Sequence, residues 1–228
     1  MKPQNKKHIP LSSLFLVFLG SILTGLTYIA LSGIGIPLDR EFPMSFIVYV
    51  TCVCLTVAIV VSVLKSKGWQ MSDMGFKRPS RKMMFMGVLF FVLAALVVYP
   101  ITMLINSALG VEIKGMDYAI NSIGDVIAAI LVCAVIGPMA EEILFRGFLI
   151  KVAQQKISNK GILGVLAIFC FSIIHVPYFG IGGMILITFW AVLPVSLYIY
   201  YDNIYPGYIM HSLNNLLAYL FVPLFLRV

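Results

Sequence analysis

Charged residues are scarce in this chain of 228 residues, and their scarcity limits its class at once. Only 11% of the residues are Asp, Glu, Lys or Arg, whereas 61% are hydrophobic and the mean hydropathy is +1.02. Soluble globular domains have about half of their residues apolar and about a quarter charged. The composition therefore excludes an ordinary soluble domain and predicts an integral membrane protein, with little chain left for anything outside the bilayer.

Cysteine is also rare, and the sequence has no internal repeat or low-complexity tract. The four cysteines, Cys52, Cys54, Cys133 and Cys170, all lie inside apolar runs. Neither their positions nor the single Cys-x-Cys spacing is typical of a zinc site or a disulfide framework, so we interpret them as small packing residues. They carry no information about the redox compartment.

Basic residues outnumber acidic ones, which gives the chain a formal net charge of +7. They gather beside apolar runs, so nucleic acid is not an expected partner. Alternate connections hold most of them: Lys2, Lys6 and Lys7; Lys65, Lys67, Lys77, Arg78, Arg81 and Lys82; and Lys151, Lys156 and Lys160. Cytoplasmic connections of membrane proteins carry such an excess of Lys and Arg. The distribution predicts a multi-pass protein of the cell membrane with a cytoplasmic N-terminus.

Apolar runs long enough to cross a bilayer, about 20 residues each, occur along the whole chain. We expect seven spans, at residues 11–36, 42–64, 83–109, 123–153, 162–178, 184–201 and 204–225. The first run exceeds the roughly 7 to 15 residues of a signal-peptide core, so we expect a retained anchor. The predicted fold is all-α, a polytopic transmembrane bundle of about seven helices with an intramembrane active-site cavity. Its C-terminus would lie outside, unless a broken segment near residues 180–183 changes the number of crossings.

Two adjacent glutamates, Glu141 and Glu142, lie near the end of one apolar run, and Arg146 follows. A carboxylate in hydrocarbon is expensive, so a Glu pair within a span indicates a functional site. Residues four apart are neighbours on a helix, so Glu142 and Arg146 can neutralise each other and order the site. Glu141 is then the free carboxylate, a candidate general base toward water. The alternative is that both glutamates simply bind Arg146.

Two of the three histidines also lie in predicted spans. Counted along antiparallel helices, Glu141 and His175 lie about 18 Å and 20 Å from the same cytoplasmic side, so they can meet. His211 and Asn215 share one helix face and can both donate hydrogen bonds to a developing oxyanion. The same count places His211 only about 10 Å deep. The alternatives are a packing role for His175 and interhelical hydrogen bonding for the His211–Asn215 pair.

These residues resemble the pattern of the CPBP family of intramembrane proteases, which groups CAAX prenyl endopeptidases with bacteriocin-processing and Abi proteins. The family pattern is Glu-Glu-x-x-x-Arg, then Phe-x-x-x-His, then His-x-x-x-Asn on successive helices. The chain has Glu141 to Arg146, then Phe171 to His175, then His211 to Asn215. The resemblance implies N-terminal helices without motifs, at 1–122, and a CPBP/Abi-like catalytic core, at 123–228, within one integrated membrane domain.

The resemblance also implies roles for these residues. Glu141 would activate a water molecule, His175 would help to hold it, and His211 with Asn215 would stabilise the tetrahedral intermediate at the scissile carbonyl. The family is described both as metalloproteases and as glutamate proteases without a metal. Glu141, His175 and His211 could supply the three protein ligands of a zinc site. Because the chain has no His-Glu-x-x-His pairing, we expect that no cofactor is required, with zinc as the alternative.

The expected partners are the lipid bilayer and a membrane-associated peptide or protein substrate. Short sequences of this kind resemble bacterial members of the family, which favours a bacterial plasma membrane and leader or signalling peptides over prenylated substrates. The alternative function is a non-catalytic bacteriocin-immunity or regulatory scaffold. A transporter ranks third, because no pair of broken, symmetry-related segments is present. The substrate and the oligomeric state stay open.

Overall fold

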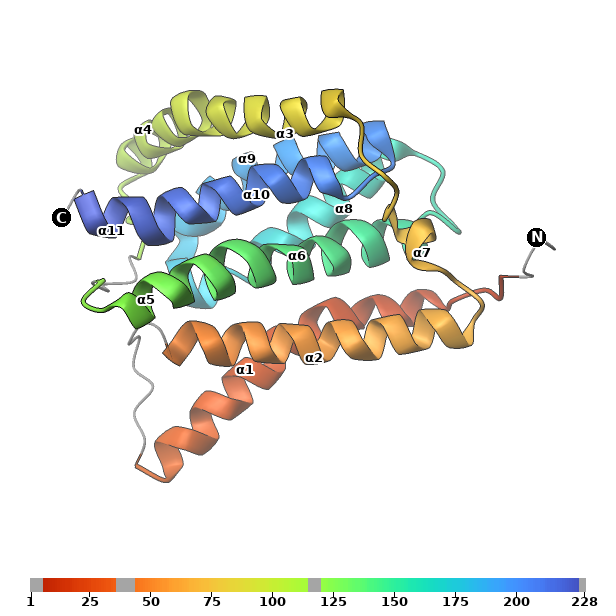
Figure 1. Ribbon diagram of the computed structural model, residues 1–228, viewed down its shortest axis with the longest axis horizontal. Helices are drawn as coiled ribbons and strands as arrows, with labels where there is room; N and C mark the ends of the chain where they lie inside the picture. The colour runs from red at the N-terminus through yellow and green to blue at the C-terminus, as the bar shows by residue number, and fades with distance from the viewer. Residues whose placement is uncertain (1–5, 36–43, 115–119, 226–228) are drawn as a thin grey trace.

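The chain is an all-helical, multi-pass membrane protein. The computed structural model describes residues 6–35, 44–114 and 120–225, and every regular element in these ranges is a helix (Figure 1). Within the described residues, six apolar helical stretches are long enough to cross a membrane, and a further apolar helix, α8, has 14 residues. The predicted helical bundle is confirmed.

The element bounds are as follows, in chain order. They are η1 (Leu11–Phe15) with α1 (Leu16–Gly33); α2 (Met44–Ser66); η2 (Met71–Met74); α3 (Arg81–Leu93), η3 (Ala94–Val98) and α4 (Tyr99–Leu109); α5 (Ile123–Ala128), η4 (Ala129–Ile136), α6 (Gly137–Glu142), η5 (Ile143–Ile150) and α7 (Lys151–Ala153); α8 (Lys160–Ile173); α9 (Val176–Tyr201); and α10 (Tyr205–Leu216), η6 (Leu217–Phe221) and α11 (Val222–Phe225).

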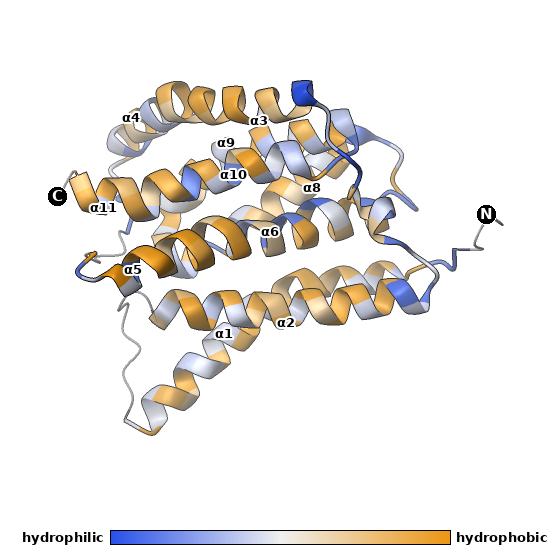
Figure 2. Ribbon diagram, viewed as in Figure 1, coloured by the Kyte–Doolittle hydropathy of each residue, from blue (hydrophilic) through white to orange (hydrophobic). Residues whose placement is uncertain are grey.

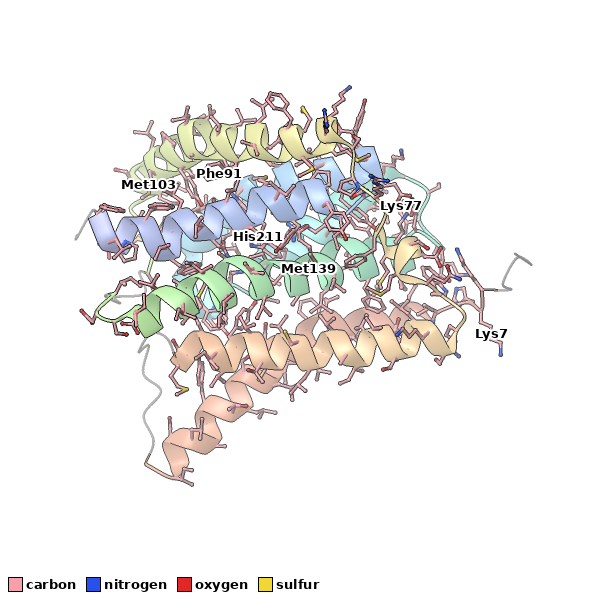
Figure 3. All side chains as sticks on the ribbon, in the orientation of Figure 1. Lys7, Lys77, Phe91, Met103, Met139 and His211 are labelled. Carbon is pink, nitrogen blue, oxygen red and sulfur yellow. The ribbon has the colours of Figure 1, made fainter. Side chains whose placement is uncertain are left out.

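The helices run back and forth between two ends of the bundle (Figure 1). Hydrophilic residues concentrate at the end where α7 lies, and Lys7 and Lys77 lie there, whereas Met103 lies at the opposite end (Figures 2 and 3). This lysine-rich end, called the basic end below, is where the positive-inside pattern predicts the cytoplasm. The cytoplasmic side itself stays a prediction. Lys2, Asp39, Arg40, Glu41 and Asp117 lie outside the described residues.

The boundary between the fifth and sixth predicted spans differs from the structure. The predicted span at 162–178 ends early, because α8 stops at Ile173 and a turn holds His175 before α9 begins. Within α9, Gly180 has φ 68° and ψ −167°, a conformation that favours glycine. The bend is held by the Lys114 amide, which donates to the Phe179 carbonyl at 3.0 Å. The bend thus lies beside the segment after α4, at the end opposite the basic end.

The segment that follows the Glu pair, η5, is enclosed on all sides by the bundle. All eight residues of η5 are buried, and Phe148 and Leu149 have no exposed surface. Other helices turn large apolar side chains outward, such as Leu96 and Leu104, each 71% exposed. Outward apolar faces suit contact with lipid. Polar groups between Gly137 and Ile150 are therefore away from solvent and can pair mainly with one another.

Two π-helical segments, η4 and η5, flank α6 on this same helix. The Gly137 amide donates to the Val132 carbonyl, which is a bond to the fifth residue back. The next such bond would join the Cys133 carbonyl to position 138, but Pro138 has no N–H to donate. The Cys133 carbonyl is therefore left without a partner on its own helix. Such π segments are frequent at functional sites.

Candidate active site

Glu142 and Arg146 form the ion pair that their spacing predicts. Arg146 Nη1 lies 3.2 Å from Glu142 Oε1, and neither side chain has any exposed surface. The Arg146 guanidinium also lies over the Phe171 ring, with its central carbon 4.4 Å from the ring centroid. An aromatic face attracts a cation, so Phe171 adds to the stabilisation of the buried charge. The alternative that both glutamates simply bind Arg146 lacks support, because the only ion pair formed by Arg146 within the described ranges is with Glu142.

His211 joins the two glutamates. Its Nδ1 lies 3.0 Å from Glu142 Oε1, and its Nε2 lies 3.5 Å from Glu141 Oε2. The imidazole lies in the interior of the bundle (Figure 3), 4% exposed, with the Trp190 ring edge-on at 4.8 Å. Both ring nitrogens thus face carboxylates.

The depth count for His211 was wrong in placing it too shallow to reach Glu141. The count assumed that the last helix starts at the membrane edge. Instead the turn before α10 is covered: Asn203 is 1% exposed and Ile204 not at all. The Ile204 amide donates to the Gly75 carbonyl at 3.1 Å, so the segment after η2 lies over this turn. α10 therefore starts below the basic end, and His211 reaches the depth of the Glu pair.

Tyr49 of α2 is a site residue that the sequence motifs did not identify. Its hydroxyl donates to Glu141 Oε1 at 2.6 Å, and the Tyr178 ring packs edge-on against it with centroids 5.6 Å apart. A tyrosine near a span end is usually interpreted as a headgroup anchor, and Tyr49 does not fit that interpretation. Tyr198 corrects the same interpretation, because it is 1% exposed and its hydroxyl donates to the Met74 carbonyl at 3.1 Å.

His175 lies in the turn between α8 and α9 and borders the same aromatic ring as Arg146. Its Nδ1 lies 2.7 Å from the Phe171 carbonyl, and its ring centroid is 4.6 Å from that of Phe171. His211 lies 5.9 Å from the same ring. A carbonyl only accepts, so Nδ1 carries the proton and Nε2 of His175 is left as an acceptor. Such a nitrogen suits contact with a water molecule.

Asn215 has a partner that the motif does not predict. Its Nδ2 donates to the Cys133 carbonyl at 2.9 Å, and its Oδ1 accepts from Asn214. The Cys133 carbonyl is the group left unpaired by Pro138, so Asn215 satisfies it from the neighbouring helix. One amide N–H of Asn215 is committed in this way. Its part in binding an oxyanion stays a prediction.

Several polar atoms around the site have no hydrogen-bond partner among the described residues. They are Glu142 Oε2, Arg146 Nε and Nη2, Trp190 Nε1, Ser172 Oγ and Ser212 Oγ, together with Arg146 Nη1, whose contact with Glu142 is an ion pair without hydrogen-bond geometry. Buried polar groups are nearly always hydrogen-bonded, so a cluster of exceptions calls for an explanation. A region with unused donors beside a carboxylate is suited to hold a polar reactant.

The described residues do not assemble a three-ligand metal site. No group of three His, Cys, Asp or Glu side chains in the ranges 6–35, 44–114 and 120–225 is close enough to hold a metal ion. A catalytic zinc site needs three protein ligands and one open position. Glu141 and His211 meet, but His175 does not complete a triad with them.

The fold and the site define a class: a multi-pass helical membrane protein with a buried acid–base cluster. Within that class, residues 123–217 match the family model described as Type II CAAX prenyl endopeptidase Rce1-like. The match spans all three motifs and confirms the CPBP resemblance, and at the level of class it supports a protease. No curated protein and no solved structure matches the chain. The division into 1–122 and 123–228 stays a prediction.

Proposed function

We propose that the protein is an intramembrane endopeptidase in which Glu141 activates the attacking water. One observation carries this proposal: Glu142 is tied to Arg146 and to His211, whereas Glu141 Oε2 faces His211 without a close hydrogen bond. The Glu142 carboxylate is used to hold the site together, and the Glu141 carboxylate is left to act as a base. A positioned general base contributes roughly 10² to 10⁴ in rate.

The tautomer of His211 determines which of its ring nitrogens donates a hydrogen bond and which one accepts. Because Glu142 Oε1 accepts at 3.0 Å, Nδ1 of neutral His211 carries the proton and Nε2 presents a lone pair toward Glu141. A water molecule entering beside this pair donates one hydrogen to Glu141 Oε2 and the other to Nε2. Its oxygen lone pair is then free to attack a carbonyl carbon while Glu141 takes the proton. Glu141 later returns that proton to the leaving amine.

His175 and Asn215 keep the roles that the resemblance implies. The acceptor Nε2 of His175 would help to hold the water, and the second amide N–H of Asn215 would donate to the oxyanion. His211 would join Asn215 there only when its Nε2 is protonated, because the Nδ1–H is already used by Glu142. Donors fixed in a dry site act more strongly than the same donors in water. No cofactor is needed for these steps, and zinc stays the alternative.

The substrate class follows from the surroundings of the site. An apolar pocket of about 360 Å³ lies between α2 and η4, lined by Ile47, Val50, Leu55 and Val132 among others. Tyr49 is the chain neighbour of Val50, so the pocket lies close to the site. An apolar opening on this side suits a membrane-associated peptide that approaches from the bilayer. Leader or signalling peptides in a bacterial plasma membrane are the clients we expect.

The test is cleavage of a membrane-peptide library in vesicles, measured by mass spectrometry. The wild type is compared with Glu141→Gln and with Glu112→Gln, which alters an exposed carboxylate between α4 and α5. We expect cleavage by the wild type and by Glu112→Gln, and a loss of about 10² to 10⁴ in Glu141→Gln. Equal cleavage by all three proteins would remove Glu141 as the base, and no cleavage by any would favour the scaffold. Repeating the assay with a chelator separates the metal-free site from the zinc site.

A further inference from the structure

The two oxygens of Glu141 have different neighbours, because the Tyr49 hydroxyl bonds to one of them and His211 faces the other. Tyr49 donates to Oε1 at 2.6 Å, and His211 Nε2 faces Oε2 at 3.5 Å. A distance of about 2.5 to 2.7 Å is typical of an O–H donor on an ionised carboxylate, which makes this a strong bond. Oε1 is therefore held, and Oε2 is the oxygen left for a proton.

We propose that Tyr49 is a positioning residue for the reaction, because it fixes Glu141 so that Oε2 alone acts as the base. This inference rests on the proposed function. It assigns a role to a helix that lies before the matched region 123–217 and carries none of the three motifs. The catalytic core is then incomplete without α2.

Packing holds the Tyr49 ring where its hydroxyl meets Glu141. The Tyr178 ring covers one edge of it at 5.6 Å. On the other side α2 comes close to α6, because Gly137 has no side chain: a Cβ there would lie 3.3 Å from Val50 Cγ2 and 3.0 Å from the Val132 carbonyl. Tyr49 precedes Val50 on the same helix, so the close approach at Gly137 sets how far its hydroxyl reaches. The contact thus depends on two helices and not on a flexible side chain.

Tyr49 also supplies Glu141 with a close hydrogen bond. Glu142 already has Arg146 and His211 on Oε1, whereas in the described part of the chain the close hydrogen bond to Glu141 comes from Tyr49. Without that hydroxyl, Glu141 can rotate and present either oxygen, or turn away from His211. Misplacement of a catalytic group lowers the rate of the chemical step while substrate binding is kept.

Three variants at one position separate hydrogen bonding from packing. Tyr49→Phe removes the hydroxyl, Tyr49→4-methylphenylalanine fills its volume without a donor, and Tyr49→4-aminophenylalanine restores an N–H donor. A hydrogen bond to a charged group is worth enough to change a rate roughly 10- to 100-fold. We expect kcat to fall by that factor in the first two variants with KM unchanged, and to recover in the third.

The matched control is Tyr198→Phe, which also removes a buried hydroxyl bond, that to the Met74 carbonyl. We expect a lower unfolding temperature for this variant and a wild-type kcat. If Tyr49→Phe lowers the unfolding temperature but not kcat, or if the amino variant fails to recover kcat, Tyr49 has no positioning role. Glu141→Gln is assayed in parallel: if it stays active, the proposed function itself is wrong, whatever Tyr49 does.

Discussion

Two groups of opposite charges in this molecule are built in different ways. In the interior, Glu142 and Arg146 have no exposed surface, and several of their polar atoms lack hydrogen-bond partners among the described residues. At the basic end, Lys6 pairs with Asp73 at 2.6 Å, and Asp202 pairs with both Lys77 and Lys151. The side chains of Lys77 and Asp202 are each 47% exposed.

The exposed pairs and the buried pair differ in what they contribute to the stability of the fold. Forming an exposed ion pair costs little hydration free energy, and the pair contributes only about 0 to 1 kcal/mol to the free energy of unfolding. A buried pair costs more in lost hydration, and apolar residues of similar volume often replace it without loss of stability. The interior charges are therefore poor stabilisers for their cost. Their presence in the interior fits the proposed function, in which a carboxylate takes part in a reaction.

The largest effect should follow from Arg146→Met, which leaves Glu142 as an unmatched buried charge. We expect the free energy of unfolding to fall by about 3 to 5 kcal/mol, with low yield and no cleavage. Thermal unfolding of the purified protein in detergent measures the first effect. The double variant Glu142→Gln with Arg146→Met removes both charges and should recover most of the stability but not the activity. Wild-type stability of the single variant would contradict the pairing.

An intermediate effect is expected from Asn215→Leu, which leaves the Cys133 carbonyl unpaired. Loss of one partner of a buried hydrogen bond costs about 1 to 3 kcal/mol. The cost should shrink in a Pro138→Ala background, because an alanine at this position supplies the N–H that can bond to Cys133 within the helix. A double-mutant cycle on thermal unfolding measures this coupling. Additive effects of the two changes would show that Asn215 does not act through Pro138.

The smallest effect should come from Asp202→Asn at the basic end. Asn tolerates the φ of 48° at this position, so only the charge is lost, and we expect a change of at most about 1 kcal/mol with unchanged cleavage. Glu112→Gln serves as the control for loss of an exposed negative charge. Loss of folding or of activity in Asp202→Asn would show that the exposed charges matter as much as the buried ones.

The Asp202→Asn variant also tests how the stability of the fold depends on pH. Partial burial raises the pKa of Asp202, but hydrogen bonds and charges from Lys151 and Lys77 lower it more, so the net pKa lies below its usual value. Ionised Asp202 therefore stabilises the fold above its unfolded pKa of about 3.9, and this contribution is lost as the pH falls through the lower folded pKa. Between about pH 5 and pH 2, the unfolding temperature of the wild type should fall more steeply than that of Asp202→Asn.

The helices and the Glu142–Arg146 pair could be predicted from the sequence because both depend on local spacing. Apolar length sets the spans, and a four-residue interval sets the pair. The motif order also brought His211 to the Glu pair correctly, although the depth count placed it too shallow. That count failed because the covering of the α9–α10 turn by Gly75 is a contact between segments more than a hundred residues apart.

Tyr49 could not be found from the sequence for a related reason. A tyrosine near a span end is usually an interfacial anchor, and nothing in its neighbours along the chain departs from that pattern. Its role depends on how closely α2 approaches Gly137, which is a property of packing and not of either helix alone. The bend at Gly180 is similar, because the glycines marked an interruption while the direction of the chain depended on Lys114 and Phe179.

The location of Arg146 on the same helix as Glu142 also bears on how the protein is made. A chain is synthesised from its N-terminus, so α2 is made before the helix that carries the Glu pair. Tyr49 is thus in place before Glu141 is made, whereas His211 arrives with the last helix. The Glu142–Arg146 charges are matched within their own helix at the moment of insertion, and Glu141 then meets a Tyr49 that is already present. The buried charge of Glu142 is therefore matched before the rest of the site is made, and the site is complete once the helix that carries His211 has been made.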